Sequence, residues 1–287
     1  MRPCTSMKPT IFWLACGLIL VSAACSRQDV RPVVILATTS SVGNSGLLEV
    51  LQPAFEQLSG VRVRGHLVGS GLALQMLERG QVDVAISHAP EMEARFLRAH
   101  PGWLYRKLMY NDFLLVGPLG DPAGVLSAPS IEVAIQRIVK DGARFVSRGD
   151  ESGTHTREQQ LFKLAEVSLS AEDVVITGHG MSRTLRIASE IEAYTLTDAA
   201  TFARMNDILH LRPVFQGGSN LLNTYAVITT TSDPDAVKRA GAVSLFEWLT
   251  DGGGRPLITN FRANPEVAWF MVWPAARPRG EPNALPF

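Results

Sequence analysis

The chain has 287 residues, of which 46% are hydrophobic and 19% are charged, and its 27 basic residues balance 27 acidic ones. This length is enough for one large domain or two of medium size, since domains usually run to ~100–200 residues. The absence of a basic excess excludes a nucleic-acid binder that works by charge. After residue 30, no apolar stretch in the sequence approaches the ~18 consecutive residues of a membrane span.

The first segment has the layout of a secretory signal. Arg2 and Lys8 come before an apolar run over residues 11–21, which ends in the small residues Ser22-Ala23-Ala24. The run is too short to span a bilayer stably, whereas a basic start and a small-residue end match a cleaved export signal. We therefore predict a signal peptide over residues 1–24 and a protein of the periplasm or cell envelope.

All three cysteines lie in this leader or directly after it, at Cys4, Cys16 and Cys25. Cleavage before Cys25 leaves a single thiol at the new N-terminus, so no disulfide framework can form. A cysteine that follows Ser-Ala-Ala and precedes polar residues is arranged like the acceptor of a lipoprotein. We expect Cys25 to be lipidated and to provide the protein's membrane attachment, with ordinary cleavage beside an incidental cysteine as the alternative.

The first half of the mature chain alternates short β-branched runs with amphipathic stretches, which is typical of α/β layers. The predicted strands cover residues 33–37, 61–63 and 82–86, and the predicted helices follow at 47–58 and from residue 70. A polar or glycine-rich loop follows each strand, at residues 38–46, 68–71 and 87–90. Because ligands of open α/β sheets bind beyond the carboxyl ends of the strands, these loops are candidates for one site.

A second α/β unit begins after the strand predicted at 113–118, which closes with Gly117-Pro118. It comprises predicted helices at 131–139 and 157–164 and predicted strands at 145–146, 174–176, 193–197 and 211–214. A strand at 225–228 returns the chain to the first unit, before a helix at 236–249 and a proline-rich tail at 274–286, which is either a surface strap or a loosely ordered segment. We therefore predict one lobe from residues 25–116 with 225–287, a second lobe from 117–224, and a hinge at the two crossings.

The loop over residues 147–155, Ser-Arg-Gly-Asp-Glu-Ser-Gly-Thr-His, lies between a predicted strand and a predicted helix. The first N–H groups of a helix lack intrahelical partners and the helix dipole is positive there, so Ser152, Gly153 and Thr154 offer an anion both backbone and hydroxyl donors. Gly153 lets the backbone approach closely. Arg148 adds a charged, planar fork of donors that suits two oxygens of one oxyanion.

A simpler interpretation of this loop needs no ligand. Ser152 and Thr154 would cap the following helix, while Arg148 pairs with Asp150 in a solvated turn. The loop alone does not separate this interpretation from an anion site.

Hydroxyl residues in the first unit favour the anion site. Thr39 and Ser40 in one loop and Ser70 in the next place hydroxyls and free N–H groups at predicted helix starts. Helix starts of this kind in both units point to one shared cleft, so we predict that Thr39, Ser40 and Ser70 bind together with the residues of the second unit.

A serine hydrolase is the alternative from another class, because Ser152, His155 and Asp150 lie close in the sequence. Closeness in sequence is not triad geometry, and Ser152 lacks the Gly-x-Ser-x-Gly elbow of α/β-hydrolases. The sequence contains neither a His-Glu-x-x-His motif nor paired cysteines for a metal. We therefore expect no catalytic residue, no metal and no cofactor.

Taken together, several stretches resemble the tungstate-binding proteins of ABC transporters, which are two-lobed type II periplasmic binding proteins. The resemblance spans about residues 35–257 and is carried by segments 36–41, 45–48, 109–113, 145–155, 180–181, 193–198 and 221–225. It implies an α/β fold of two lobes, each a mixed sheet flanked by helices, with a two-strand hinge.

The resemblance also implies which residues bind. Arg148, Ser152, Gly153 and Thr154 would act from the second lobe, and the first loop and Ser70 from the first. The family's first loop usually has a third threonine where Ser40 stands, and glutamine and aspartate where Gly43 and Asn44 stand. Ser40 keeps the hydroxyl, so anion binding is still expected.

The expected cargo is an oxyanion, which a monomer would deliver to a membrane permease driven by an ATPase. Phosphate near neutral pH carries a proton that needs an acceptor, whereas tungstate, molybdate and sulfate need only donors. Phosphate-binding relatives have an aspartate where His88 stands, and an unpaired phosphate OH costs ~1–3 kcal/mol. We expect tungstate, with molybdate or phosphate as alternatives and sulfate too small for the cavity.

Overall fold

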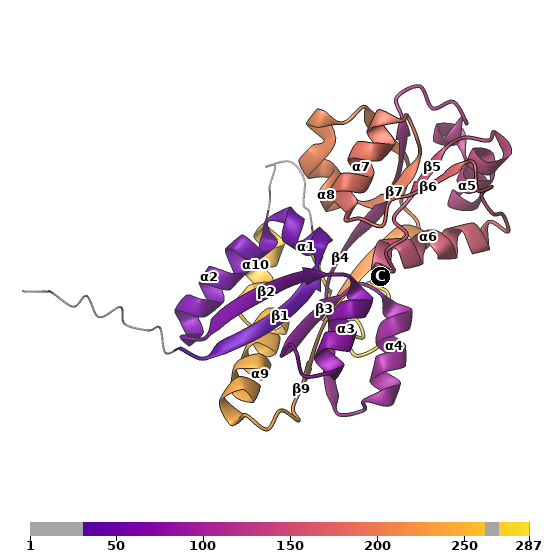
Figure 1. Cartoon of the computed structure of the whole chain (residues 1–287). Helices are drawn as coiled ribbons and strands as arrows, with labels where there is room; N and C mark the ends of the chain where they lie inside the picture. The colour runs from indigo at the N-terminus through magenta and orange to yellow at the C-terminus, as the bar shows by residue number, and fades with distance from the viewer. Residues whose placement is uncertain (1–30, 262–269, 287) are drawn as a thin grey trace, which may run out of the picture. The chain divides into compact units, whose positions relative to one another are not determined.

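The computed structural model of the protein describes residues 31–261 and 270–286 (Figure 1). The predicted signal peptide over residues 1–24 and the predicted lipidation of Cys25 lie outside the described residues. Within those two ranges, no helix is both long enough and apolar enough to cross a membrane.

The first sheet places three loop-bearing strand ends at one edge. β1 (Val33–Thr39) pairs in parallel with β2 (Arg62–Val68) on one side and with β3 (Val84–Ser87) on the other. The register sets Thr39 opposite Val68, and it sets Ala37 opposite Ala85 of β3. The loops that follow these strands are therefore neighbours, as the sequence predicted.

Helices cover both faces of this sheet. Val34 and Leu36 pack in one core cluster with side chains of α2 (Leu47–Ser59), α9 (Ala236–Thr250) and α10 (Gly254–Asn260). Ala37, on the opposite face, packs with α3 (Ser70–Glu78) and α4 (Pro90–Ala99). Burial on both faces explains why the predicted strand was an uninterrupted apolar run rather than an alternating one.

β4 (Trp103–Pro118) is the longest strand and belongs to both sheets (Figure 1). Its residues 103–112 pair antiparallel with β9 (Leu222–Thr230), which also pairs with β3. Its residues 113–118 pair instead with β7 (Thr195–Asp198) and β8 (Leu211–Gln216). β4 thus changes partners between Asp112 and Phe113. The lobe boundaries expected at residues 116/117 and 224/225 stay predictions.

The second half of the chain buries a core of its own. β5 (Phe145–Ser147) pairs in parallel with β6 (Val174–Ile176), and Phe145 bridges to Tyr194. One face packs against α5 (Ile131–Lys140) and α6 (Gly153–Leu164), and the other against α7 (Met181–Glu190) and α8 (Ala199–Met205). We call these strands, together with β7, β8 and residues 113–118 of β4, the second sheet, since the Phe145–Tyr194 bridge joins β5 to the residue before β7. Helices flank both sheets, which confirms the predicted α/β architecture.

Several elements differ from the sequence-based expectation. Residues 40–45, predicted as loop, form the short helix α1 (Ser40–Ser45), and α6 begins at Gly153 rather than near residue 157. α4 and α7 were not predicted. The sequence of α1 contains no apolar repeat, and its start is defined instead by Thr39, whose side chain accepts a hydrogen bond from Val42 N at 3.4 Å.

The C-terminal segment lies along β4, so of the two alternatives for the proline-rich tail the structure has the strap. Its short strand β10 (Met271–Val272) pairs antiparallel with β4. Trp273 is fully buried and its indole N–H donates to Pro278 O at 3.1 Å. Further along, Lys107 N donates to Arg279 O at 2.7 Å, so the strap is fixed to the strand that joins both sheets.

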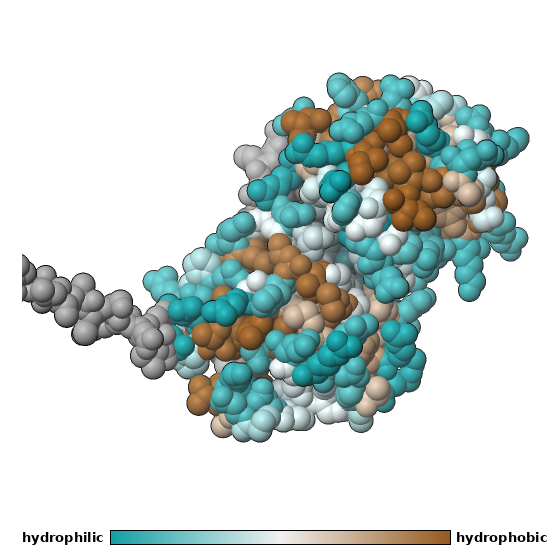
Figure 2. Space-filling view, viewed as in Figure 1, coloured by the Kyte–Doolittle hydropathy of each residue, from teal (hydrophilic) through white to brown (hydrophobic). Residues whose placement is uncertain are grey.

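Exposed apolar side chains cover two of the loops near the sheet edges. Figure 2 shows hydrophobic surface over β2 and near β6, where Leu67 and Ile176 are 51% and 68% exposed. A methyl group added at Gly43 would lie 2.4 Å from Leu67 Cδ2, and one added at Gly149 would lie 2.3 Å from Ile176 Cγ2. Both glycines are therefore needed for the close approach of these side chains to the loop backbone.

Candidate functional site

The first-sheet loops present hydroxyl groups at two helix starts. Thr39 is buried at the N-terminus of α1, and Ser40 follows it. Ser70 is fully buried at the start of α3, and its Oγ accepts a hydrogen bond from His88 N at 3.1 Å. Since a hydroxyl that accepts still has its own hydrogen, the Ser70 hydroxyl keeps a donor for a ligand.

The second-sheet loop holds a nearly buried arginine in a fixed position. Arg148 is 3% exposed and pairs with Asp150, to which both its Nε (3.2 Å) and one terminal nitrogen donate. Burial would raise the pKa of Asp150, but the charge of Arg148 and hydrogen bonds from Ser152 outweigh burial, and the pKa is lowered. Asp150 is thus an ionised partner that orients Arg148.

Ser152 does cap the helix, as the simpler interpretation proposed. Its Oγ accepts from His155 N at 3.3 Å, and its own N–H donates to Asp150 Oδ1 at 3.2 Å. Capping leaves the Ser152 hydroxyl hydrogen and the remaining N–H groups of the first turn available to a ligand. Helix capping and anion binding are therefore compatible at this loop.

Short distances connect the loops of the two sheets. A methyl added at Gly69 would lie 3.8 Å from Ser152 Cα, and one added at Gly153 would lie 2.7 Å from His88 Nε2. On the other side, a methyl at Gly180 would lie 4.0 Å from Ser40 Oγ. The structure thus brings the helix starts of both sheets together, while anion binding by their residues stays a prediction.

Two of the buried side-chain donors that lack a partner belong to these loops, Thr38 at the end of β1 and Thr154 in the first turn of α6. Within residues 31–261 and 270–286, the buried side-chain atoms that have no hydrogen-bond partner are Thr38 Oγ1, Asn111 Nδ2, Thr154 Oγ1 and Arg212 Nε. Leaving such a group unpaired costs ~1–3 kcal/mol. Thr154 was a predicted site residue, whereas Thr38 and Asn111 were not singled out as ligands. Thr38 directly precedes the predicted Thr39, so the same hydroxyl-rich run pointed to it.

His88 is a neutral acceptor. It is buried, and burial outweighs its hydrogen bond to Asn223 and lowers its pKa to about 4. The Asn223 amide nitrogen donates to Asn111 Oδ1 at 2.9 Å and to Tyr225 Oη at 2.8 Å, so its oxygen must accept from His88 Nδ1, 2.8 Å away. The lone pair is therefore on Nε2, which can accept a hydrogen bond. The sequence argument against phosphate did not consider this acceptor.

Glu158 is a second titrating group that the sequence did not reveal. It lies on α6 at 6% exposure, and its Oε2 accepts from Arg148 N at 3.4 Å. Burial raises its pKa to about 7, against hydrogen bonds from Ser147 and Arg148 that lower it. Its charge near Arg148 therefore changes close to neutral pH.

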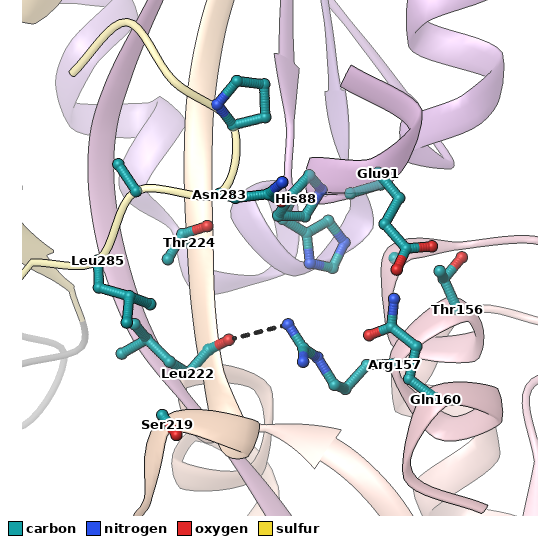
Figure 3. Close-up of a pocket in the computed structure, with 15 residues that line it drawn as sticks. His88, Glu91, Thr156, Arg157, Gln160, Ser219, Leu222, Thr224, Asn283 and Leu285 are labelled. Carbon is teal, nitrogen blue, oxygen red and sulfur yellow. Dashed lines mark hydrogen bonds between the residues drawn. The ribbon is translucent and has the colours of Figure 1, made fainter. Parts of the chain in front are cut away.

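A cavity of about 190 Å³ lies beside these loops, with His88 and Gly153 in its wall (Figure 3). Gly153 is the one predicted anion-binding residue that lines it. The remaining wall comes from α6, β9, the start of α4 and the C-terminal strap. In the described part of the chain, no group of three or more His, Cys, Asp or Glu side chains could hold a metal ion.

Comparisons with known proteins identify the family of the chain. The model of the PBP superfamily domain matches residues 26–251. The tungstate-binding protein TupA of Peptoclostridium acidaminophilum is 35% identical over 238 residues, which cover 82% of this chain and 83% of that protein.

Two solved structures are similar in both sequence and fold. The tungstate ABC transporter structure from Geobacter sulfurreducens is 38% identical, with a TM-score of 0.72, over 80% of this chain and 98% of that one. The tungstate-binding protein TupA from Desulfovibrio alaskensis G20 is 36% identical, with a TM-score of 0.70, over 84% and 98%. The chain is therefore a solute-binding protein rather than an enzyme, and it belongs to the PBP superfamily, in the family of the tungstate-binding proteins.

Proposed function

We propose that the protein captures tungstate outside the cytoplasm and delivers it to the permease and ATPase of an ABC importer. The observation that carries this proposal is a pair of buried hydroxyls with no partner of their own, Thr38 Oγ1 at the end of β1 and Thr154 Oγ1 in the first turn of α6. They belong to the loops that approach each other, and Arg148 lies in the loop before α6. An oxyanion would satisfy all of them, and in a site shielded from water each charge-assisted hydrogen bond is stronger than in solution.

The proposed binding set is supported by the closeness of the loops of the two sheets. Arg148, Ser152, Gly153 and Thr154 would donate from the loop before α6 and its first turn. Thr39, Ser40 and Ser70 would donate from α1 and α3, whose starts lie close to that turn and to Gly180. No carboxylate is needed as an acceptor, because tungstate is fully deprotonated at neutral pH and accepts hydrogen bonds only.

The choice of tungstate over molybdate or phosphate is supported by the relatives, whose names describe tungstate-binding proteins. The chemistry of the site distinguishes these anions less sharply. Asp150 is engaged by Arg148 and Ser152, so it is a poor acceptor for a phosphate OH. His88 Nε2, however, could accept a hydrogen bond from that OH, so phosphate remains an alternative. Molybdate also remains one, because it has the same charge and shape as tungstate.

Export and anchoring belong to the same proposal. The basic start, apolar run and small-residue end of residues 1–24 support secretion to the periplasm or cell envelope, and Cys25 supports a lipid anchor. Mass spectrometry of the mature N-terminus tests this directly. A thioether-linked lipid on Cys25 is the expected result, and an unmodified N-terminus would remove the anchor.

We further propose that β4 and β9 form the hinge between a lobe of residues 25–116 with 225–287 and a lobe of residues 117–224. The change of partners along β4 supports this division. Closure of the hinge around the anion would contract the protein, so small-angle scattering with and without tungstate is expected to give a smaller radius of gyration for the complex. An unchanged radius would argue against hinge closure.

Isothermal titration calorimetry with tungstate, molybdate, sulfate and phosphate tests the function. We expect one tungstate per chain, weaker phosphate binding and little heat with sulfate. Arg148→Ala should abolish most of the affinity without unfolding the protein, whereas Arg98→Ala, on the exposed end of α4, is the matched control. No heat with any of the four anions would refute the proposal, and turnover of a phosphate or acyl ester that is lost in Ser152→Ala would favour a hydrolase.

A further inference from the structure

The cavity beside His88 has a wall that the proposed tungstate site does not use. Residues of the first two turns of α6 line it, together with Ala89, Pro90 and Glu91, and Figure 3 shows Glu91 beside Thr156 and Gln160. Thr224 and Leu222 of β9 and the strap residues 282–285 complete the wall. At about 190 Å³ the cavity has room for roughly six waters, since each water occupies ≈ 30 Å³ of liquid, or for a ligand of similar size.

Arg157 supplies a charge that the protein leaves almost without partners. Its side chain is half-buried and its guanidinium lies over the Phe113 ring, 6.0 Å from the ring centre. It donates to Leu222 O at 3.5 Å, which is long for a hydrogen bond, and it forms no ion pair within the described ranges. Because a guanidinium stays protonated and carries five N–H donors, most of these donors remain free for a ligand.

Thr224 adds a second donor on the opposite wall. Its Oγ1 accepts from Lys107 Nζ at 2.7 Å, so the hydroxyl hydrogen is available to a ligand. Lys107 itself is completely buried behind Thr224, which makes that hydroxyl a stronger donor. Figure 3 shows the Thr224 hydroxyl and the Arg157 guanidinium on either side of the same space.

The rest of the wall limits the charge of the ligand. The exposed carboxylate of Glu91 lines the cavity and its charge acts on Arg157, so a second negative charge on a ligand would be repelled. Leu222, Leu285 and Pro90 offer apolar surface to a carbon chain. The arrangement suits a single carboxylate on the arginine fork with a short apolar tail, rather than a dianion.

We propose that this cavity is a second ligand site, which binds a small monocarboxylate through Arg157 and Thr224. His88 and Gly153 separate it from the proposed tungstate site, so the two sites share a wall but not their charged residue. Arg148 would serve the inner site and Arg157 the outer one. The proposal does not depend on the identity of the inner anion.

Sodium propionate is the probe, titrated into the full mature protein at constant ionic strength with sodium chloride as the reference. Methyl NMR signals of Leu222 and Leu285 should shift saturably with propionate and not with chloride. Arg157→Gln should weaken this binding by about tenfold or more, as expected for loss of a charge-assisted pair. Arg157→Lys should retain part of it, and Arg148→Ala, which removes the inner-site charge, should leave it unchanged.

Glu91→Gln provides a second variant on an exposed side chain, where folding is not at risk. It should raise the affinity for the dianion malonate while changing that for propionate little. The proposal is overturned if propionate gives no saturable shift or shifts Arg157→Gln equally. It is also overturned if tungstate binds at two per chain and the second site is lost in Arg157→Gln, because the outer ligand would then be a dianionic oxyanion.

Discussion

Gly153→Ala tests whether the contact between α6 and His88 sets the geometry of the site. No left-handed backbone conformation is required at Gly153, so alanine is acceptable to the backbone and only space is at issue. The new methyl would lie 2.7 Å from His88 Nε2 and 2.8 Å from its Cδ2. The ring cannot easily withdraw, because Asn223 holds Nδ1 and the ring stacks on Tyr225 with centroids 5.1 Å apart.

The expected cost follows from overpacking. Inserting a methyl into a closely packed site costs about 1–3 kcal/mol, and the start of α6 must move by several tenths of an ångström to relieve the contact. We expect urea unfolding to show this loss of stability and calorimetry to show tungstate affinity reduced by about tenfold, which corresponds to 1.4 kcal/mol. Gly102→Ala is the control, because a methyl there meets no atom within 4 Å.

The double mutant Gly153→Ala/His88→Ala tests whether the contact with His88 causes the losses expected for Gly153→Ala. In a His88→Ala background the added methyl has space, so Gly153→Ala should there cost much less than in the wild type. Equal losses in both backgrounds would place the cause elsewhere. Wild-type stability and affinity in Gly153→Ala would refute the close contact itself.

Three further variants probe the buried groups. Thr154→Val should leave the free protein as stable as the wild type or more so, because it removes an unpaired hydroxyl, and yet weaken tungstate binding in calorimetry; unchanged affinity would show that the hydroxyl serves no ligand. Burial raises the pKa of Glu158 from 4.5 to about 7, because it disfavours the charged form. The contribution of this group to the stability of the protein is therefore complete below pH 4.5 and is lost as the pH rises from there through 7. Between pH 5 and pH 8 this group should change the free energy of unfolding by about 2.5 kcal/mol, and Glu158→Gln should remove that change in urea unfolding; equal pH profiles of the variant and the wild type would contradict the burial of Glu158. Lys107→Met leaves the buried carboxylate of Glu93, 3.7 Å from the amine, without its charge partner and should cost about 3–5 kcal/mol. Glu93→Gln in addition removes the unpaired charge and keeps an oxygen that can accept from Ala89 N or the Tyr105 hydroxyl, so it should restore part of this loss; an additive second loss would argue against the pair.

The sequence was informative where one local pattern determines structure. The apolar run over residues 33–37 and the hydroxyl-rich residues after it predicted β1 and the first loop, because burial on both faces requires continuous apolar residues. The first part of β4 was missed because Lys107, Asn111 and Asp112 interrupt its apolar character. Lys107 lies inside only because Glu93 and Thr224, distant in sequence, surround it.

The residues of the candidate site also differ in how far the sequence could predict them. Arg148, Ser152 and Thr154 belong to a contiguous run, and helix-start chemistry identified them as donors. The state of His88 depends on Asn223, more than a hundred residues away in the chain, and on the amide network that fixes its tautomer. Arg157 looked like an ordinary helix residue, since only the fold places β9 and the C-terminal strap opposite it.

A crystal structure of the mature protein grown with one equivalent of tungstate tests the central claim most directly, because tungsten scatters anomalously and its position needs no interpretation. The expected result is a single strong anomalous peak among Arg148, Ser152, Thr154 and Ser70, with oxygens within hydrogen-bond distance of Thr38 Oγ1 and Thr154 Oγ1. A peak beside Arg157 alone, or no peak at all, would contradict the proposed site.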